Sequence, residues 1–221
     1  MTLPTPADGA APAYFGVYPA IVADIVDPDH LGRIEVRFPW LGSDGDRDVR
    51  GWATLCTPYA DDKQGLQILP EVDSQVVVAF EAGNLRRPYI VGSTWNGQAS
   101  LAHDPQRTNN IRQIRSRADS RLEFDDDQAG AKVRLTMRSG HSVTLDDASQ
   151  EITIVHAMGG TIKMTAASIE VTANATVEIT APLLTVDAAV STFSGLVKCQ
   201  TLIADTMVMS PAYTPGAGNV W

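Results

Sequence analysis

The sequence contains very little cysteine. Its 221 residues include two cysteines, Cys56 and Cys199, which are far apart and have neither metal-ligand nor redox-motif spacing. This scarcity excludes a disulfide-stapled scaffold and a cysteine-rich zinc fold. We expect both side chains to be small, buried and apolar, in a reducing compartment.

Long apolar runs and a targeting pattern are also lacking. The longest apolar runs, such as 76–80, are far shorter than the roughly 20 residues that a membrane-spanning helix needs. Residues 1–15 have no basic start and no apolar centre. The sequence therefore predicts neither a transmembrane helix nor a secretory signal.

Basic residues are fewer than acidic ones. Lys and Arg number 17 and Asp and Glu number 26, which gives a formal net charge of -9 at pH 7. Proteins that track a nucleic-acid backbone depend on counterion release by Lys and Arg, so no nucleic-acid partner is expected. Hydrophobic residues make up 44% of the chain, which is enough to form a folded core.

Five short segments with β-branched or alternating apolar residues occur in the first hundred positions. Turn-forming clusters at 27–32, 42–46 and 81–84 separate them. Short strands at this density predict an OB-type barrel at 14–100, preceded by an N-terminal arm at 1–13. The predicted strands are 17–26, 33–38, 51–57, 75–80 and 88–92.

The stretch 101–119 reads as a connector, because it has turn residues and no helical apolar stripe. Two interpretations of its basic residues stay open. They grip an acidic partner, or they pair with the neighbouring acidic residues Asp119, Glu123 and 125–127. The basic residues in question are Arg107, Arg112, Arg115 and Arg117.

From residue 122 onward, apolar-x-apolar triplets recur at short intervals, separated by turn residues such as those at 139–140 and 159–160. Short strands at a small period predict a β-solenoid or a stacked array. The triplets are Leu122/Phe124, Val133/Leu135, Val143/Leu145, Ile152/Ile154, Ile162/Met164, Ile169/Val171, Val177/Ile179 and Leu184/Val186.

A repeat of one strand cannot enclose a core within one chain. Three chains that wind about one axis can enclose one, and their strand edges then pair between chains. We therefore predict an all-β chain in which 120–209 form an intertwined trimeric β-helix needle and 210–221 a tip segment. The predicted trimer core comprises Ile152, Ile154, Ile162, Met164, Ile169, Val171, Val177 and Ile179.

Several motifs occur in order within residues 14–97: GRIEVRFPW at 32–40, PEVDSQVVVAFEAG at 70–83 and RPYIVGS at 87–93. In these motifs the sequence resembles the central-spike family of contractile tails, which includes phage baseplate assembly protein V and the type VI secretion spike VgrG. The repeats after residue 120 extend the resemblance by architecture, because family members carry a trimeric β-helical needle there.

That resemblance implies a non-enzymatic, homotrimeric spike that pierces a target cell envelope. Such a spike is assembled in the bacterial cytoplasm as part of a phage tail or injection-particle baseplate. Because only a short arm precedes the barrel, the resemblance implies a separate hub protein at the barrel end. No histidine follows His156, so the iron-binding His-x-His apex of some phage spikes is absent. A separate PAAR-type protein is then expected at the C-terminal end, with Tyr213 and Trp221 at its interface.

Candidate groups for chemistry are sparse. The four histidines have no zinc spacing, and the acidic run 125–130 has Thr136 where a calcium loop needs Glu. Trp40 and Trp52 are candidates for stacking on a nucleic acid or a sugar. Packing in the barrel or the trimer interface accounts for them better, because no basic groove accompanies them. Glu35 alternates with apolar neighbours, so we expect an exposed or interface charge rather than a general acid. No catalytic residue, metal or cofactor is expected.

Two other functions stay open. A monomeric OB-fold ligand-binding module would have a native mass of 23.7 kDa. A tail-associated β-helix that degrades polysaccharide would need paired carboxylates in a cleft, whereas the acidic residues of the repeats are isolated in turns.

Overall fold

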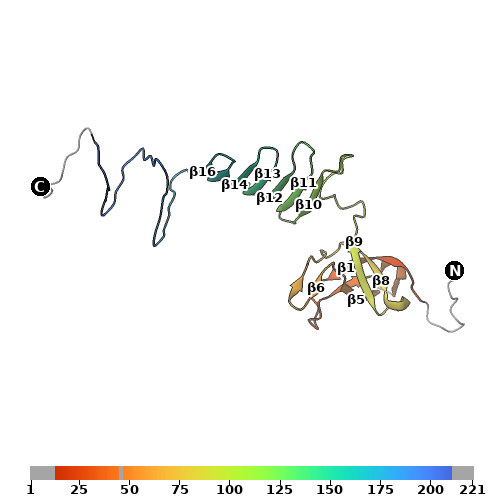
Figure 1. Cartoon of the computed structure of the whole chain (residues 1–221). Helices are drawn as coiled ribbons and strands as arrows, with labels where there is room; N and C mark the ends of the chain where they lie inside the picture. The colour runs from red at the N-terminus through yellow and green to blue at the C-terminus, as the bar shows by residue number, and fades with distance from the viewer. Residues whose placement is uncertain (1–12, 45–46, 211–221) are drawn as a thin grey trace. The chain divides into compact units, whose positions relative to one another are not determined.

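The structure is a computed structural model that describes residues 13–44 and 47–210. The chain divides into two units, Met1–Asn174 and Ala175–Trp221. The first unit contains a closed barrel and a separate sheet (Figure 1). The described helices are two single 3-10 turns, η1 (Pro39–Leu41) and η2 (Glu81–Gly83), and neither is long enough to cross a membrane. The predicted all-β class is confirmed.

Five strands close the barrel in the order β1-β2-β5-β9-β8. Neighbours are antiparallel except β5 and β9, which are parallel. This closed five-stranded arrangement fits the OB fold, as expected, and each observed strand end lies within two residues of its predicted position. The strands are β1 (Val17–Asp24), β2 (Arg33–Arg37), β5 (Arg50–Leu55), β8 (Gln75–Phe80) and β9 (Pro88–Ser93).

Two small hairpins decorate the barrel. One pairs β3 (Ser43–Asp44) with β4 (Arg47–Asp48), and the other pairs β6 (Ala60–Asp61) with β7 (Gln64–Gly65). Both lie in connections between barrel strands, where a local turn does not disturb the core.

Strict alternation along the strands builds the barrel core. In β8, for example, Val76, Val78 and Phe80 point inward and are buried, while the residues between them are partly exposed. Burial of these side chains is the main favourable term in folding the barrel. The buried hydrophobic residues are Ala20, Val22, Ile34, Val36, Phe38, Ala53, Val76, Val78, Phe80 and Ile90.

A buried carboxylate organises the loop between β1 and β2. Asp27 accepts hydrogen bonds from the backbone N–H groups of Asp29, Leu31 and Arg33, at 3.0–3.1 Å. Its two oxygens also accept a two-pronged contact from the Arg33 guanidinium, with both N···O distances 2.9 Å. The hydrogen bonds from the Arg33 side chain hold the pKa of Asp27 well below its usual range. The loop conformation therefore depends on an ionised Asp27.

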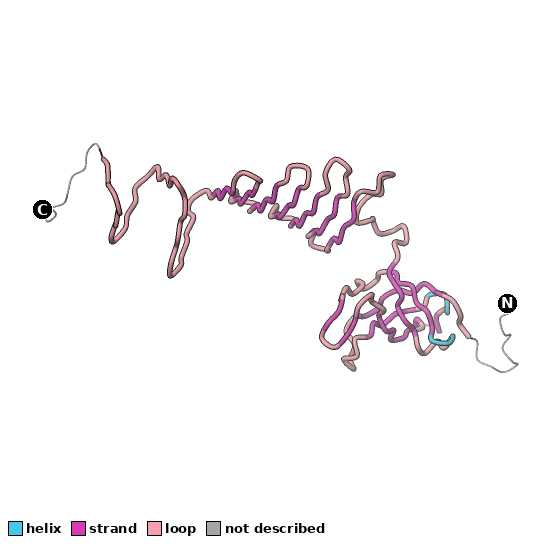
Figure 2. Tube along the Cα trace, in the orientation of Figure 1, coloured by secondary structure: helices cyan, strands magenta, loops and turns pink. Residues whose placement is uncertain are grey.

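The second sheet is a seven-stranded antiparallel meander in which each strand pairs with the next one along the chain. Figure 2 shows these strands as a regular series. The strands are β10 (Ile111–Arg115), β11 (Arg121–Asp125), β12 (Lys132–Thr136), β13 (Ser142–Asp146), β14 (Glu151–Val155), β15 (Thr161–Met164) and β16 (Ile169–Thr172).

The meander corrects three expectations. Successive strands pair within one chain up to β16, whereas the sequence predicted strands that pass between three chains from residue 120 onward. Hairpin turns of a few residues let each strand return beside its predecessor, so in-chain pairing is available. In addition, β10 lies inside 101–119, the stretch expected to be a connector. Finally, the triplets Val177/Ile179 and Leu184/Val186 form no strand in the described chain.

Residues 175–209 follow a different path. They are exposed throughout, contain no strand, and bend near 175, 182, 189, 194–195, 200 and 205–206. No backbone hydrogen bond joins them to one another or to the rest of the described chain. Figure 2 shows residues 175–209 as loops. Among the described residues, their backbone N–H and C=O groups have no backbone partner, and their large apolar side chains are exposed.

Both cysteines are exposed in the described chain, contrary to expectation. Cys56 follows β5, in which Ala53 is buried and alternate residues face outward. The two-residue period therefore turns Cys56 away from the core. Cys199 lies in the unpaired stretch described above.

We expect Asp27→Asn to lower the melting temperature of the barrel by several degrees at neutral pH, because an amide cannot accept all the hydrogen bonds that the carboxylate accepts. Since the folded pKa of Asp27 is depressed, its contribution is complete above the ordinary value of 3.8 and is lost as the pH falls through the folded pKa. The difference in melting temperature between the variant and the wild type should therefore narrow below pH 3.8, the ordinary pKa. Thermal unfolding followed by tryptophan fluorescence measures both temperatures.

The matched control is Asp29→Asn. The Asp29 side chain is 67% exposed and contacts Arg33 at 2.6 Å. Because an exposed ion pair contributes little to stability, removing the Asp29 charge should change the melting temperature little. Equal melting temperatures for wild type and Asp27→Asn at neutral pH would contradict the assigned role.

Candidate functional site

One face of the meander consists of two parallel rows of apolar side chains. The strand register aligns these positions across the sheet, and residues two apart on each strand share this face. The first row is Ile114, Leu122, Leu135, Val143, Ile154, Ile162 and Val171. The second row starts with Arg112 on the edge strand and continues with Phe124, Val133, Leu145, Ile152, Met164 and Ile169. We call these two rows the apolar face.

The apolar face is uncovered in the part of the chain that the structure describes. Ile152 and Ile162, on the interior strands β14 and β15, are 39% and 38% exposed, and Ile169 on the last strand is 71% exposed. A sheet ordinarily buries its hydrophobic face against a second layer. A contiguous exposed apolar surface of this kind indicates a protein–protein interface.

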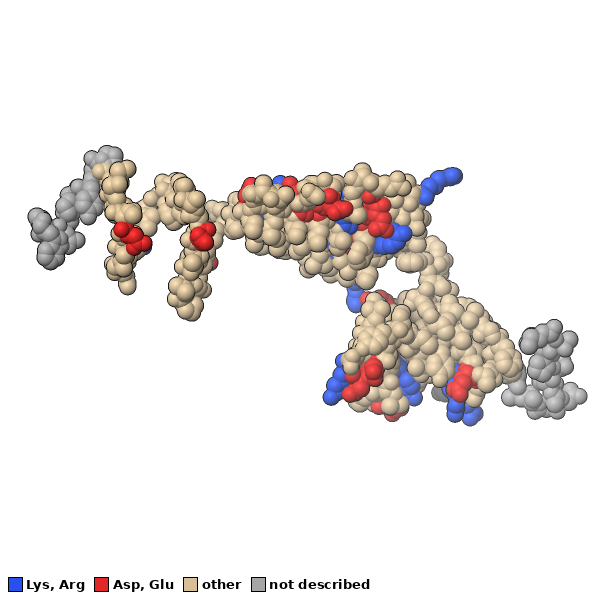
Figure 3. Space-filling view, in the orientation of Figure 1, with Lys and Arg blue, Asp and Glu red and all other residues tan. Residues whose placement is uncertain are grey.

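The opposite face of the meander is polar and pairs its own charges. Lys132 contacts Asp146 at 2.7 Å, Arg134 contacts Glu123 at 2.7 Å, and Lys163 contacts Glu151 at 2.8 Å. The hydrogen bond from Lys132 lowers the pKa of Asp146, and the hydrogen bond to Glu151 raises the pKa of Lys163. Figure 3 shows charged side chains gathered over the sheet. The polar face is therefore complete in one chain, and the apolar face is not.

The structure brings six of the eight predicted core residues together on the apolar face: Ile152, Ile154, Ile162, Met164, Ile169 and Val171. Val177 and Ile179 lie outside the sheet and are 55% and 67% exposed. The predicted tip residues Tyr213 and Trp221 lie outside the described residues.

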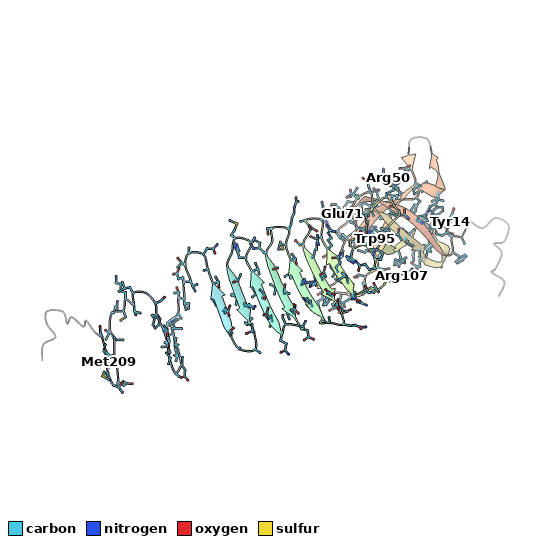
Figure 4. The ribbon with its side chains drawn as sticks, turned by 90° about the horizontal axis from the view of Figure 1, so that it is seen from above. Tyr14, Arg50, Glu71, Trp95, Arg107 and Met209 are labelled. Carbon is cyan, nitrogen blue, oxygen red and sulfur yellow. The ribbon has the colours of Figure 1, made fainter. Side chains whose placement is uncertain are left out.

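The sequence-based core omitted members of both rows on the first four strands. For Leu122, Phe124, Val133, Leu135, Val143 and Leu145 the signal was present, because each belongs to one of the apolar triplets. Ile114 has no such signal, because it belongs to no apolar triplet. Figure 4 shows the side chains standing out from the strands of the sheet.

The arginines of the predicted connector mostly pair with nearby acids, which supports the second of the two interpretations. Arg112 contacts Asp126, and Arg115 contacts Asp119 at 2.7 Å. Asp119 also accepts hydrogen bonds from Arg121, and these two arginines lower its pKa, with Arg121 the larger cause. Arginines paired in this way are not free to grip an acidic partner.

Trp40 belongs to the barrel packing. Its ring stacks on Tyr18 with centroids 4.6 Å apart, and its indole N–H donates to the Pro19 carbonyl at 2.9 Å. Trp52 lies beneath the Arg33 guanidinium, 5.7 Å from the ring centroid. Neither ring is therefore an open stacking platform.

The outer face of β2 and β5, where OB folds commonly bind ligands, is neutralised by ion pairs. Arg50 contacts Glu35 at 3.3 Å, which gives Glu35 the role of a paired charge, and Arg37 contacts Asp48 at 3.6 Å. An oligonucleotide would require a basic groove, which these pairs do not supply.

The acidic run 125–130 forms a turn rather than a metal loop. Asp125 contacts Arg134 at 3.3 Å, and Asp127 accepts a hydrogen bond from the Ala129 N–H. Within 13–44 and 47–210, no three His, Cys, Asp or Glu side chains cluster so as to hold a metal ion.

Residues 18–95 match the family described as the type VI secretion system/phage-baseplate injector OB domain. The barrel is therefore similar to injector OB domains. The matched span begins in β1 and ends just after β9, so it covers the closed barrel. Over this region the chain resembles the VgrG-like spike family, as expected from its motifs.

Three curated relatives match the same part of the chain. The type VI secretion system spike protein VgrG3 of Vibrio cholerae is 29% identical over 84 residues. The actin cross-linking toxin VgrG1 of the same species is 27% identical over 84 residues. The type VI secretion system spike protein VgrG1a of Pseudomonas aeruginosa is 26% identical over 77 residues. Each match covers 34% of this chain, but only 8–12% of the relative. The matches therefore concern the OB-domain region, and they carry no information on the meander.

Proposed function

We propose that this protein is a non-enzymatic central spike of a contractile phage tail or a related injection system. It acts as a homotrimer that pierces a target cell envelope. The observation that carries the proposal is an injector OB domain followed in the same chain by a sheet whose apolar face has no cover. The spike proteins VgrG3 and VgrG1a, which share this OB domain, support the assignment to an injection apparatus.

In the proposed trimer, two further copies of this chain cover the apolar face. Three meanders placed around an axis direct all the apolar rows inward and all the ion-paired faces outward, which suits a prism in water. Residues 175–209 favour three copies over two. They bend repeatedly and have no backbone hydrogen-bond partner within 13–44 and 47–210, so both edges of each extended stretch need a neighbouring chain.

The proposed mechanism is mechanical. Force applied along the needle must be transmitted without unfolding, and in the proposed trimer each extended stretch of residues 175–209 can leave only by breaking hydrogen bonds to other chains. Such an assembly resists unfolding kinetically as well as thermodynamically. A separate hub protein binds the barrel, and a separate PAAR-type protein binds the C-terminal segment. The particle is assembled in the bacterial cytoplasm and carries the spike in its baseplate.

Ile162→Asp should block trimer formation. The variant would bring three carboxylates into the covered interior, and each unpaired buried charge costs several kcal/mol, on the order of 3–5 kcal/mol. Native mass spectrometry should find a trimer for the wild type, at three times the chain mass of 23.7 kDa, and a monomer for the variant.

Thr144→Asp is the matched control, because Thr144 lies in the centre of the ion-paired face and pairs in register with Arg134. This variant should remain trimeric. A monomeric wild type would favour the alternative, a ligand-binding OB module. Release of sugars from a polysaccharide would favour a tail-associated degrading enzyme.

Truncation should separate the contributions of the two needle parts. A chain ending at residue 119 should lose resistance to SDS and heat completely, because it retains neither the meander nor the intertwined stretch. A chain ending at Asn174 should keep the apolar face and form a trimer that dissociates faster than the full chain. The mobility of unboiled samples in SDS gels measures the resistance of both shortened chains. A fully SDS-resistant chain ending at 119 would contradict the proposed needle.

Deletion of residues 210–221 should abolish co-purification with a PAAR-type partner and leave the trimer intact. The physical reason is that a prism of strands ends in unpaired backbone groups and an open apolar core, which require a cap. Capture of the partner by the shortened chain would place the docking surface elsewhere on the needle.

A further inference from the structure

Two histidines lie beside the apolar face, at the end of the meander where the β12–β13 and β14–β15 turns lie. His141 precedes β13 and His156 follows β14, directly beyond the aligned pair Ser142 and Val155. Because alternate residues share a face, His141 lies on the same side as Val143, and His156 on the same side as Ile154. The two imidazole rings are in contact, with centroids 4.5 Å apart and planes inclined by 51°.

Backbone hydrogen bonds define the neutral form of both rings. The Ala157 N–H donates to Nδ1 of His141 at 3.2 Å, and the Met158 N–H donates to Nδ1 of His156 at 3.2 Å. A ring nitrogen that accepts a hydrogen bond carries no proton, so each neutral ring holds its proton on Nε2. Protonation would place a hydrogen on each Nδ1, opposite an N–H donor, and would break both bonds. Metal binding through Nε2 would likewise move a proton to Nδ1, so the geometry disfavours a metal ligand role.

The surroundings offer no compensation for positive charge. An apolar groove formed by Leu135, Met137, Val143 and Ile154 holds both rings. Arg138 is the only charged residue within 135–142 and 154–161. On the neighbouring hairpin at this end of the strands, between β10 and β11, the single carboxylate Asp119 is paired with two arginines, and Arg117 contacts Glu71 at 2.9 Å. On β15 and β16, Lys163 and Glu170 align with each other on the opposite face.

We propose that the His141–His156 pair is an acid-sensitive latch in the spike needle. With both rings neutral, their turn hydrogen bonds are intact and the rings fit the covered apolar face. Protonation adds positive charge to rings whose centroids are 4.5 Å apart and breaks both turn hydrogen bonds. Protonation therefore opposes assembly, and we expect the needle to lose stability in acid. The latch rests on the proposed trimer, because only there is the face covered.

The test uses the full-length chain at about pH 7.5 and about pH 5.5, which bracket the range in which imidazoles titrate. Trimer dissociation in dilute SDS is timed for the wild type, for the double variant His141→Asn/His156→Asn and for the control His30→Asn/His103→Asn. Asparagine can accept the same N–H through its side-chain oxygen but does not titrate in this range. The control removes two histidines that lie in loops before the meander.

We expect wild-type and control trimers to dissociate at least about tenfold faster at the lower pH, because two hydrogen bonds are lost in each chain. The double asparagine variant should dissociate at similar rates at both pH values. Equal wild-type rates at the two pH values, or an undiminished pH dependence in the double variant, would overturn the latch and leave the spike proposal intact. A wild type that is monomeric at the higher pH would instead overturn the proposed trimer.

A second measurement needs no variant. Hydrogen exchange of the segment 155–160, followed by mass spectrometry and corrected for the intrinsic effect of pH, reports on the Ala157 and Met158 amides. Their protection should fall at the lower pH, while protection of the β11–β12 hairpin should not. Unchanged protection of 155–160 would overturn the latch even if the double variant failed to fold.

Discussion

The structure depends on one constraint: the meander has an apolar face that its own chain does not cover. Its polar face is completed by cross-strand ion pairs such as Lys132–Asp146 and Lys163–Glu151. Because alternate residues of a strand point to opposite faces, the same strands form one polar surface and one apolar surface. The described chain completes the polar surface and leaves the apolar surface exposed. In residues 175–209 the backbone N–H and C=O groups likewise have no backbone partner among the described residues.

The barrel contrasts with this part of the chain, because it is self-sufficient. Its core closes through five strands, and its loop between β1 and β2 is held by the buried Asp27–Arg33 pair. A module with a closed core suits attachment to another protein, whereas a sheet with an exposed apolar face suits association with further copies. The chain thus joins a barrel similar to injector OB domains to a sheet whose stability, in the proposed trimer, depends on the oligomeric state.

The proposed spike needs no reacting group, and the arginines on the outer face of β2 and β5 and Trp40 of the barrel are engaged in ion pairs and packing. The titratable feature that stands apart is the contact between His141 and His156. Its setting on the apolar face links it to the proposed assembly, because a charge there would be added to a surface that other copies would cover.

The sequence by itself determined the barrel strands to within two residues and located β11 to β16, because alternation and turn residues are local properties. It missed β10, whose Ile111 and Ile114 do not alternate; that strand exists because it pairs with β11. It also misjudged the partner of each strand, since in-chain and between-chain pairing both satisfy a two-residue period. Only the tertiary structure decided the continuous apolar rows and the contact of His141 with His156. Both depend on hairpin register, which is set by how turns bring distant residues together.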